Sequence, residues 1–239
     1  MLTPPQNLAE NSRNLRERIA LAAAAAGRTV DSITLLAVSK GQPASAIASL
    51  ARTGQQHFGE SYLQEALKKI DALRELELTW HFIGQLQANK TRAIAESFHW
   101  VHTVDRLKLA ERLSAQRPAY AAPLQLCLQV RLGDEPTKSG VLPAAVGNLV
   151  AAVSALPQLK LRGLMCIPPV ETQIDAQRRW FAALSELRAD LNALGAQLDT
   201  LSMGMSADLE AAIAEGSTLL RVGTALFGPR APRGSETLE

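Results

Sequence analysis

The sequence predicts an α/β fold, a closed (β/α)8 TIM barrel formed by a single domain over residues 1–239. From residue 33 onward, short β-branched or apolar runs alternate with longer stretches that are rich in Ala and Leu and have helical period. Eight of these runs have strand character. The length of 239 residues is just below the roughly 250 typical of this architecture, so we expect no second domain after the eighth strand.

The eight predicted strands are Ile33–Ser39, His57–Gly59, Trp80–Ile83, Trp100–Thr103, Leu124–Val130, Leu161–Ile167, Thr200–Ser202 and Leu219–Val222. The helices predicted between them are Ala44–Arg52, Tyr62–Leu76, Arg106–Ala115, Pro143–Ala155, Gln173–Leu194 and Ala207–Ala214. Because short strands are weak signals, a doubly wound open sheet is the competing architecture.

The two ends of the chain are expected to lie outside the repeated units. Residues 1–30 are predicted to form an extra N-terminal helix, since charged residues precede the alanine-rich stretch Ile19–Ala26 with helical periodicity. The tail from Gly228, which includes residues 229–239, is expected to be a short helix cap or to lack regular structure.

Composition and charge argue against several classes of partner. Apolar residues make up 47% of the chain and the net charge is +2, without a long basic run, so nucleic acid is not expected as the main partner. The two cysteines, Cys127 and Cys166, have no metal-ligand spacing and are interpreted as free core thiols of a reducing compartment. No apolar run approaches the roughly 20 residues that span a bilayer. We therefore expect a cytoplasmic protein that does not bind membranes.

In barrels of this type the functional groups gather on the loops that follow the strands. Lys40 directly follows the first predicted strand, where partial desolvation favours the neutral, nucleophilic form of a lysine amine. Such an amine can form a Schiff base with an aldehyde. The alternative is a solvated lysine or one that is paired with a carboxylate.

The loops after the seventh and eighth strands are the usual phosphate site of such barrels. A turn of small residues that ends at Ser206 leads into a helix with Asp208 in its first turn, and the last strand leads into Gly223 and Thr224. The alternative for Ser206 is a plain helix cap. A GxSxG nucleophile elbow is excluded, because Ser206 is followed by Ala207 and Asp208, so a hydrolase is not supported.

The arginine of the last predicted strand and the four histidines also carry polar groups that could serve a site. Arg221 ends the last strand, and its guanidinium can only donate hydrogen bonds, so it would suit a phosphate or an unprotonated ring nitrogen. Its alternative role is a salt bridge across the rim. The four histidines lack the carboxylate or thiol companions of a metal site, and we expect core or rim positions for His57, His81, His99 and His102. No metal is predicted.

Several motifs together resemble one family. They are Ala37-Val38-Ser39-Lys40, Phe58-Gly59-Glu60-Ser61-Tyr62, residues 80–90 (WHFIGQLQANK), Leu161-Arg162-Gly163-Leu164-Met165, Leu201–Ser206 and Arg221–Gly228. The chain resembles, over most of its length, the pyridoxal phosphate homeostasis proteins, small single-barrel proteins similar to the N-terminal cofactor domain of alanine racemase. The resemblance implies a barrel of the pyridoxal phosphate fold type III.

The resemblance implies a cofactor, pyridoxal 5′-phosphate, and a residue set that binds it. Lys40 would hold it as a Schiff base, Ser206 with Gly223 and Thr224 would bind its phosphate, and Arg221 would face its pyridine nitrogen. The chain departs from the family at Ser61, where Asn is usual, and at Gly41-Gln42, where Thr or Lys are common, which puts the cofactor affinity in doubt. Lys138 matches a family lysine in a flexible loop and is given no catalytic role.

The expected function is intracellular vitamin B6 homeostasis, in which a monomer stores the cofactor or delivers it to apo enzymes that depend on it, without conventional catalysis. Two alternatives stay open. One is a racemase or decarboxylase with the same cofactor, which would need a tyrosine as acid or base. Tyr62 follows the second predicted strand and could approach the mouth, and Tyr120 is the only other tyrosine. The second is an enzyme acting on sugar phosphates without this cofactor, in which Glu60 and Lys40 would form the catalytic pair.

Overall fold

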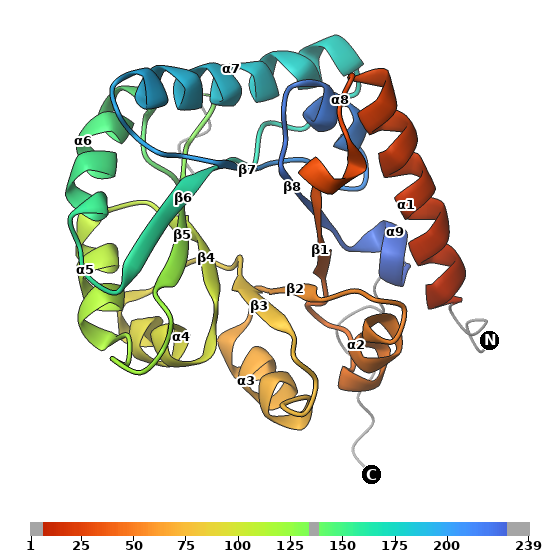
Figure 1. Ribbon diagram of the computed structural model, residues 1–239, viewed down its shortest axis with the longest axis horizontal. Helices are drawn as coiled ribbons and strands as arrows, with labels where there is room; N and C mark the ends of the chain where they lie inside the picture. The colour runs from red at the N-terminus through yellow and green to blue at the C-terminus, as the bar shows by residue number, and fades with distance from the viewer. Residues whose placement is uncertain (1–6, 134–138, 229–239) are drawn as a thin grey trace.

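Eight parallel strands close into a barrel in the order β1 to β8, with β1 paired to β8 (Figure 1). The computed structural model describes residues 7–133 and 139–228. The strands are β1 (Thr34–Val38), β2 (His57–Glu60), β3 (Thr79–Phe82), β4 (Trp100–Val104), β5 (Leu124–Gln129), β6 (Leu159–Met165), β7 (Thr200–Ser202) and β8 (Leu219–Val222). The predicted (β/α)8 barrel is therefore confirmed, and the open-sheet alternative is wrong.

The helices form an outer layer around the barrel (Figure 1). They are α1 (Leu8–Ala25), α2 (Ala44–Ala51), α3 (Leu63–Ala72), α4 (Thr91–Ser97), α5 (Leu107–Gln116), α6 (Pro143–Ser154), α7 (Ile174–Ala193), α8 (Leu209–Ala214) and α9 (Thr224–Phe227), with 3-10 turns at Val30–Ser32 and Ala88–Lys90. The sequence did not predict α4 or α9, which are short. The helix predicted from Ala207 begins at Leu209, because Asp208 is its N-cap; a helix cap at Ser206 is therefore wrong.

Side chains alternate between the two faces of each strand, and the two faces differ in chemistry. Along β3, Trp80 and Phe82 belong to the apolar core cluster beneath the helices, so His81 between them faces the barrel interior. In β8, Leu220 and Val222 belong to the same core cluster and flank Arg221. The apolar core thus lies mainly between sheet and helices, whereas part of the barrel interior is polar.

The N-terminal helix α1 packs on the outside of the barrel, next to α8 and α9 (Figure 1). It buries Leu15 and Ile19, and Asn11 Nδ2 donates to the carbonyl oxygen of Leu226 at 2.9 Å. Arg18 Nη2 donates to Glu210 at 2.8 Å. The extra N-terminal helix predicted within residues 1–30 is present, and it holds the short helix that follows the last strand.

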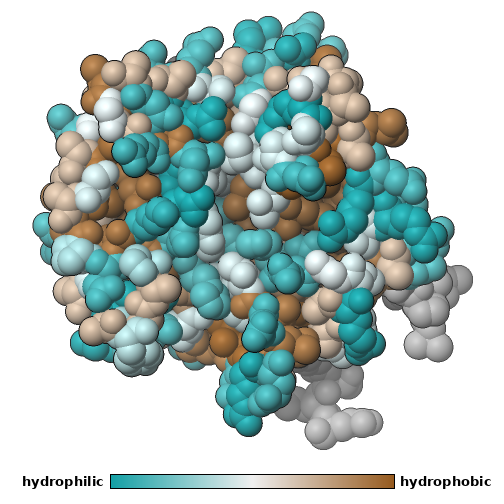
Figure 2. Space-filling view, in the orientation of Figure 1, coloured by the Kyte–Doolittle hydropathy of each residue, from teal (hydrophilic) through white to brown (hydrophobic). Residues whose placement is uncertain are grey.

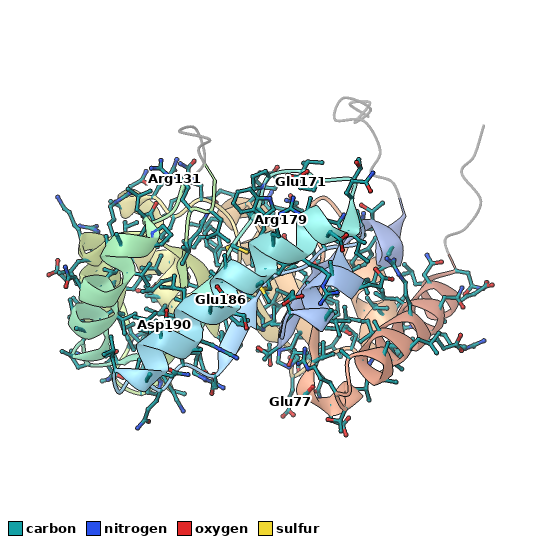
Figure 3. The ribbon with its side chains drawn as sticks, turned by 90° about the horizontal axis from the view of Figure 1, so that it is seen from above. Glu77, Arg131, Glu171, Arg179, Glu186 and Asp190 are labelled. Carbon is teal, nitrogen blue, oxygen red and sulfur yellow. The ribbon has the colours of Figure 1, made fainter. Side chains whose placement is uncertain are left out.

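The two ends of the barrel are seen from the side in Figure 3. Arg131 and Glu171, which follow β5 and β6, lie at one end, and Glu77, which precedes β3, lies at the other. We call the first end the mouth and the second the base. Hydrophilic residues cover much of the face seen along the barrel in Figure 2, with hydrophobic ones recessed between them. Within the described ranges, no helix combines the length and the apolar character needed to cross a membrane.

Candidate functional site

A cavity of about 250 Å³ opens at the mouth of the barrel. Val38 and Ile83 supply part of its apolar wall. The residues that the sequence predicted as a binding site all line it, namely Lys40, Ser206, Arg221, Gly223 and Thr224. They come from the segments that follow β1, β7 and β8 and from the end of β8 itself. The structure therefore brings the complete predicted set to one place.

The turn that carries Lys40 is held in place by a polar cluster formed by Glu60, Lys69 and Glu65. The Ser39 hydroxyl donates to Glu60 Oε1 at 2.6 Å, and Lys69 Nζ donates to the carbonyl oxygen of Ser39 at 2.8 Å. Beyond Lys40, the N–H of Gly41 donates to Glu65 Oε1 at 2.6 Å. Gly41 has a φ of 75°, a left-handed conformation that favours glycine, so the chain can turn sharply directly after the lysine.

The centre of this cluster is an ion pair between Glu60 and Lys69. Lys69 Nζ lies 2.8 Å from Glu60 Oε1 and 2.5 Å from Glu65 Oε1, and the side chains of Glu60 and Lys69 are 0% and 7% exposed. Burial raises the pKa of Glu60, against the opposing attraction of Lys69. Neither Lys69 nor Glu65 was predicted from the sequence. The signal was a charged Glu60 at the end of an apolar strand, which requires a buried partner.

The loops after β7 and β8 meet at the cavity. The N–H of Ala225, in the first turn of α9, donates to Ser206 Oγ at 3.3 Å, which joins the two loops. Gly204 has a φ of 93°, and a Cβ there would lie 2.5 Å from that of Ala212, so only glycine fits. Asp208 Oδ1 accepts from the N–H of Met205 at 2.6 Å and fixes the turn before α8.

Arg221 crosses from β8 into the floor of the cavity. Its Nη1 donates to the carbonyl oxygen of Ser202 at 2.5 Å and to Ser202 Oγ at 2.8 Å, and its Nη2 donates to the carbonyl oxygen of Cys166 at 2.7 Å. No carboxylate of the described residues pairs with it, so the rim salt bridge considered from the sequence is wrong. Two N–H groups, on Nε and Nη2, are not used by described residues.

The predicted positions of the cysteines and histidines are confirmed. Both cysteines are buried free thiols, and burial raises the pKa of Cys127 and of Cys166 to about 12, so they stay protonated. His81 and His102 are buried, His57 is half-buried and His99 is exposed at the base. Over the described ranges, no group of His, Cys, Asp and Glu is arranged to hold a metal ion.

Of the residues on which the alternative functions would depend, Lys40 lines the cavity, whereas Tyr62 and Glu60 do not. Tyr62 is 42% exposed, and neither it nor Glu60 is among the described residues that line the cavity. Glu60 pairs with Lys69, not with Lys40. Ser61 packs its backbone against Gly84, where a Cβ would lie 2.1 Å from the Ser61 carbonyl oxygen. Lys138 lies outside the described residues.

The chain matches known proteins over nearly all of its length. The family model described as alanine racemase, N-terminal domain, matches residues 6–231. The pyridoxal phosphate homeostasis protein of Pseudomonas aeruginosa is 56% identical over 223 residues, which cover 93% of this chain and 96% of that protein. The protein of the same name from Escherichia coli is 49% identical over 94% of this chain and 97% of its own length.

Solved structures agree with these matches. PipY of Synechococcus elongatus, in a structure described as having PLP bound, is 40% identical with a TM-score of 0.82 and covers 93% of this chain and 100% of that chain. Alanine racemase from Corynebacterium glutamicum is 17% identical with a TM-score of 0.67, over 96% of this chain and 63% of that chain, a likeness of fold alone. By sequence identity and by fold, the chain belongs to the pyridoxal phosphate homeostasis protein family, within the family of alanine racemase N-terminal domains.

Proposed function

We propose that this chain is a single-domain protein that binds pyridoxal 5′-phosphate in the mouth cavity and acts in intracellular vitamin B6 homeostasis by storing or delivering the cofactor. The observation that carries the proposal is that Lys40, Ser206, Arg221, Gly223 and Thr224 line one cavity. The printed description of PipY, with PLP bound, and the names of the bacterial relatives support it. The cytoplasm is the proposed compartment.

The residues present fit this cofactor. When bound, the cofactor supplies an aldehyde that a lysine amine can hold covalently. Lys40 is the lysine of the cavity lining, and the Ser39–Gly41 turn that carries it is anchored on both sides. Ser206, Gly223 and Thr224 lie on two joined loops and would hold the phosphate. Arg221 has donors to spare and no acceptor, so it suits an unprotonated pyridine nitrogen.

We expect Lys40 to carry the cofactor covalently. Borohydride reduction of the loaded protein, followed by peptide mass mapping, should place the pyridoxyl group on Lys40. The Lys40→Arg variant keeps the positive charge but lacks the nucleophilic amine, so it should lose the label and the absorption of the bound cofactor. Lys160→Arg, at an exposed position of β6, should keep both. A label on Lys138 alone, or on no lysine, would refute the assignment.

We expect the protein to be a monomer, because one chain supplies all five proposed binding residues and none needs completion by a partner subunit. Light scattering should give the mass of a single chain, about 25.7 kDa, with and without cofactor. A dimer that persists at low micromolar concentration would contradict this and would favour the racemase alternative. We propose apo enzymes that depend on the cofactor as the recipients.

A further inference from the structure

Three histidine rings are joined to one another through the barrel interior. His57 Nδ1 lies 3.0 Å from His81 Nε2, and His81 Nδ1 lies 2.9 Å from His102 Nε2. Each histidine lies two residues further along its strand than the residue in register with the previous one: His57 pairs with Thr79 and His81 with Trp100. The rings therefore climb diagonally from the base toward the mouth. We call these three residues the histidine relay.

Both ends of the relay reach a cavity. At the upper end, His102 Nδ1 lies 2.8 Å from Ser202 Oγ, which accepts from Arg221 in the mouth cavity. At the lower end, His57 lines a second cavity of about 260 Å³ at the base, together with the ion pair of Arg162 and Asp199. His57 Nε2 makes no hydrogen bond to a described residue. One hydrogen-bonded path thus runs from the base cavity to the arginine of the proposed cofactor site.

The environment keeps the rings neutral. Burial lowers the pKa of His81 well below its ordinary value, and nearby His102 and His57 lower it further. Burial, followed by the charge of Arg221, lowers the pKa of His102 to about 3. The pKa of His57 is also lowered, mainly by burial. A neutral imidazole carries one N–H and one lone pair, and each contact needs one of each, so all three rings must point the same way.

Arg221 sets that direction. Its guanidinium is only a donor, so one lone pair of Ser202 Oγ is already used. Among the described residues, the one acceptor in reach of the Ser202 hydroxyl hydrogen is His102 Nδ1. It follows that His102 donates from Nε2 to His81, and that His81 donates from Nε2 to His57. All three rings then carry their hydrogen on Nε2.

We propose that the histidine relay positions Arg221: it holds a lone pair of Ser202 Oγ toward the guanidinium and couples that contact to the base cavity. The relay can reverse only as a unit, because one ring that turned its tautomer alone would place two donors or two acceptors face to face. A change at His57 is therefore felt at Ser202, on the far side of the barrel. The consequence of this coupling for cofactor binding rests on the proposed function, whereas the hydrogen bonds of the relay do not.

The first test uses the cofactor-free wild-type protein, so its result is independent of cofactor binding. Nitrogen-15 NMR of histidine-labelled protein at about pH 7 should show Nε2 protonated and Nδ1 unprotonated in His57, His81 and His102. A doubly protonated ring, or an Nδ1–H tautomer at any of the three, would overturn the proposal.

The second test measures the coupling. His57→Phe removes the acceptor for His81 Nε2–H, and leaving this buried donor unsatisfied costs about 1–3 kcal/mol. The reversed relay instead leaves the Ser202 hydroxyl hydrogen unsatisfied, so in this variant the two directions become similar in free energy and both are populated. We expect an Nδ1–H signal at His102 and a shift of the Arg221 guanidinium signals. His57→Gln keeps an acceptor, the amide oxygen, so its His102 and Arg221 signals should resemble those of the wild type. His99→Asn is the matched control, since His99 lies at the same end and, among the described residues, its ring hydrogen-bonds with the N–H of Trp80 rather than with the relay. Unchanged His102 and Arg221 signals in His57→Phe would refute the coupling.

Discussion

Replacing Lys69 by methionine is expected to lower the free energy of unfolding by about 3–5 kcal/mol, the usual cost of removing one partner of a buried ion pair. Methionine retains the apolar stem of the lysine but not its ammonium, which lies 2.8 Å from both Glu60 Oε1 and the Ser39 carbonyl oxygen. Glu60 is 0% exposed and would be left without its cation. Chemical denaturation monitored by circular dichroism measures the loss.

The loss should depend on pH with a sign that identifies its cause. Burial already raises the pKa of Glu60 in the folded protein, and removal of Lys69 takes away the attraction that opposes this rise. A group whose folded pKa is raised stabilises the fold below its unfolded pKa, and that contribution is lost as the pH rises. The penalty in Lys69→Met should therefore be smaller at about pH 5 than at about pH 8.

Two control variants separate charge burial from lost packing. In the double variant Glu60→Gln with Lys69→Met the buried charge is gone, so it should be more stable than Lys69→Met alone at the higher pH. Arg74→Met breaks pairs with Asp71 and Glu75 in which all side chains are at least 71% exposed, and we expect a change below about 0.5 kcal/mol. Lys69→Met within 1 kcal/mol of the wild type at both pH values would contradict the interpretation.

Lys69 also acts on the proposed cofactor site, because it binds the carbonyl of the residue before Lys40. We expect Lys69→Met to weaken cofactor binding as well as stability, since the Ser39–Gly41 turn loses one of its anchors. Glu65→Gln removes the acceptor charge at Gly41 but leaves the pair of Lys69 and Glu60, and it should affect binding more than stability.

Part of this arrangement is predictable from the sequence because parallel strands give a simple rule. Every residue that directly follows a strand lies at the mouth, whichever strand it follows, so correct strand ends were enough to bring Lys40, Gly223 and Thr224 together. The strand bounds differ from the predicted ones by at most two residues. The residues can be placed together because their strands end at the same end of the barrel, and no contact between the segments needs to be known.

The contacts beneath the site could not be predicted in this way. Lys69 meets Glu60 only because α3 packs against the barrel at one particular height and rotation, which the sequence does not specify. The histidine relay depends on the stagger between neighbouring strands: His57 and His81 are 24 residues apart, and His81 and His102 are 21 apart. Neither spacing has meaning before the register is known.

Arg221→Glu is expected to lower the free energy of unfolding by at least about 3 kcal/mol. The substitution replaces a hydrogen-bond donor by an acceptor at a position that is surrounded by acceptor oxygens. The guanidinium donates to two carbonyl oxygens and one hydroxyl in an environment where Arg221 is 5% exposed. A carboxylate there would face the Ser202 and Cys166 carbonyls without a donor. Thermal or chemical denaturation of the cofactor-free variant measures this cost.

The contribution of Arg221 to cofactor binding must therefore be measured separately from its contribution to the stability of the fold. Arg221→Gln keeps two N–H donors and removes the charge, so it should be destabilised less than Arg221→Glu. With cofactor labelled at the ring nitrogen, nitrogen-15 NMR should show an unprotonated nitrogen in the wild type, because a permanent cation repels a protonated one. The protonated fraction should rise in Arg221→Gln and rise further in Arg221→Glu.

The same order is expected for any slow side reaction with amino acids, because a protonated ring withdraws electrons more strongly than a neutral one. If the ring nitrogen keeps the same protonation in Arg221→Gln, while that variant still binds cofactor, Arg221 does not face the nitrogen. The role of Arg221 would then be structural, through its three hydrogen bonds to Ser202 and Cys166. A rise in protonation without loss of binding would instead show that one side chain, at the end of β8, controls the protonation of the bound ring.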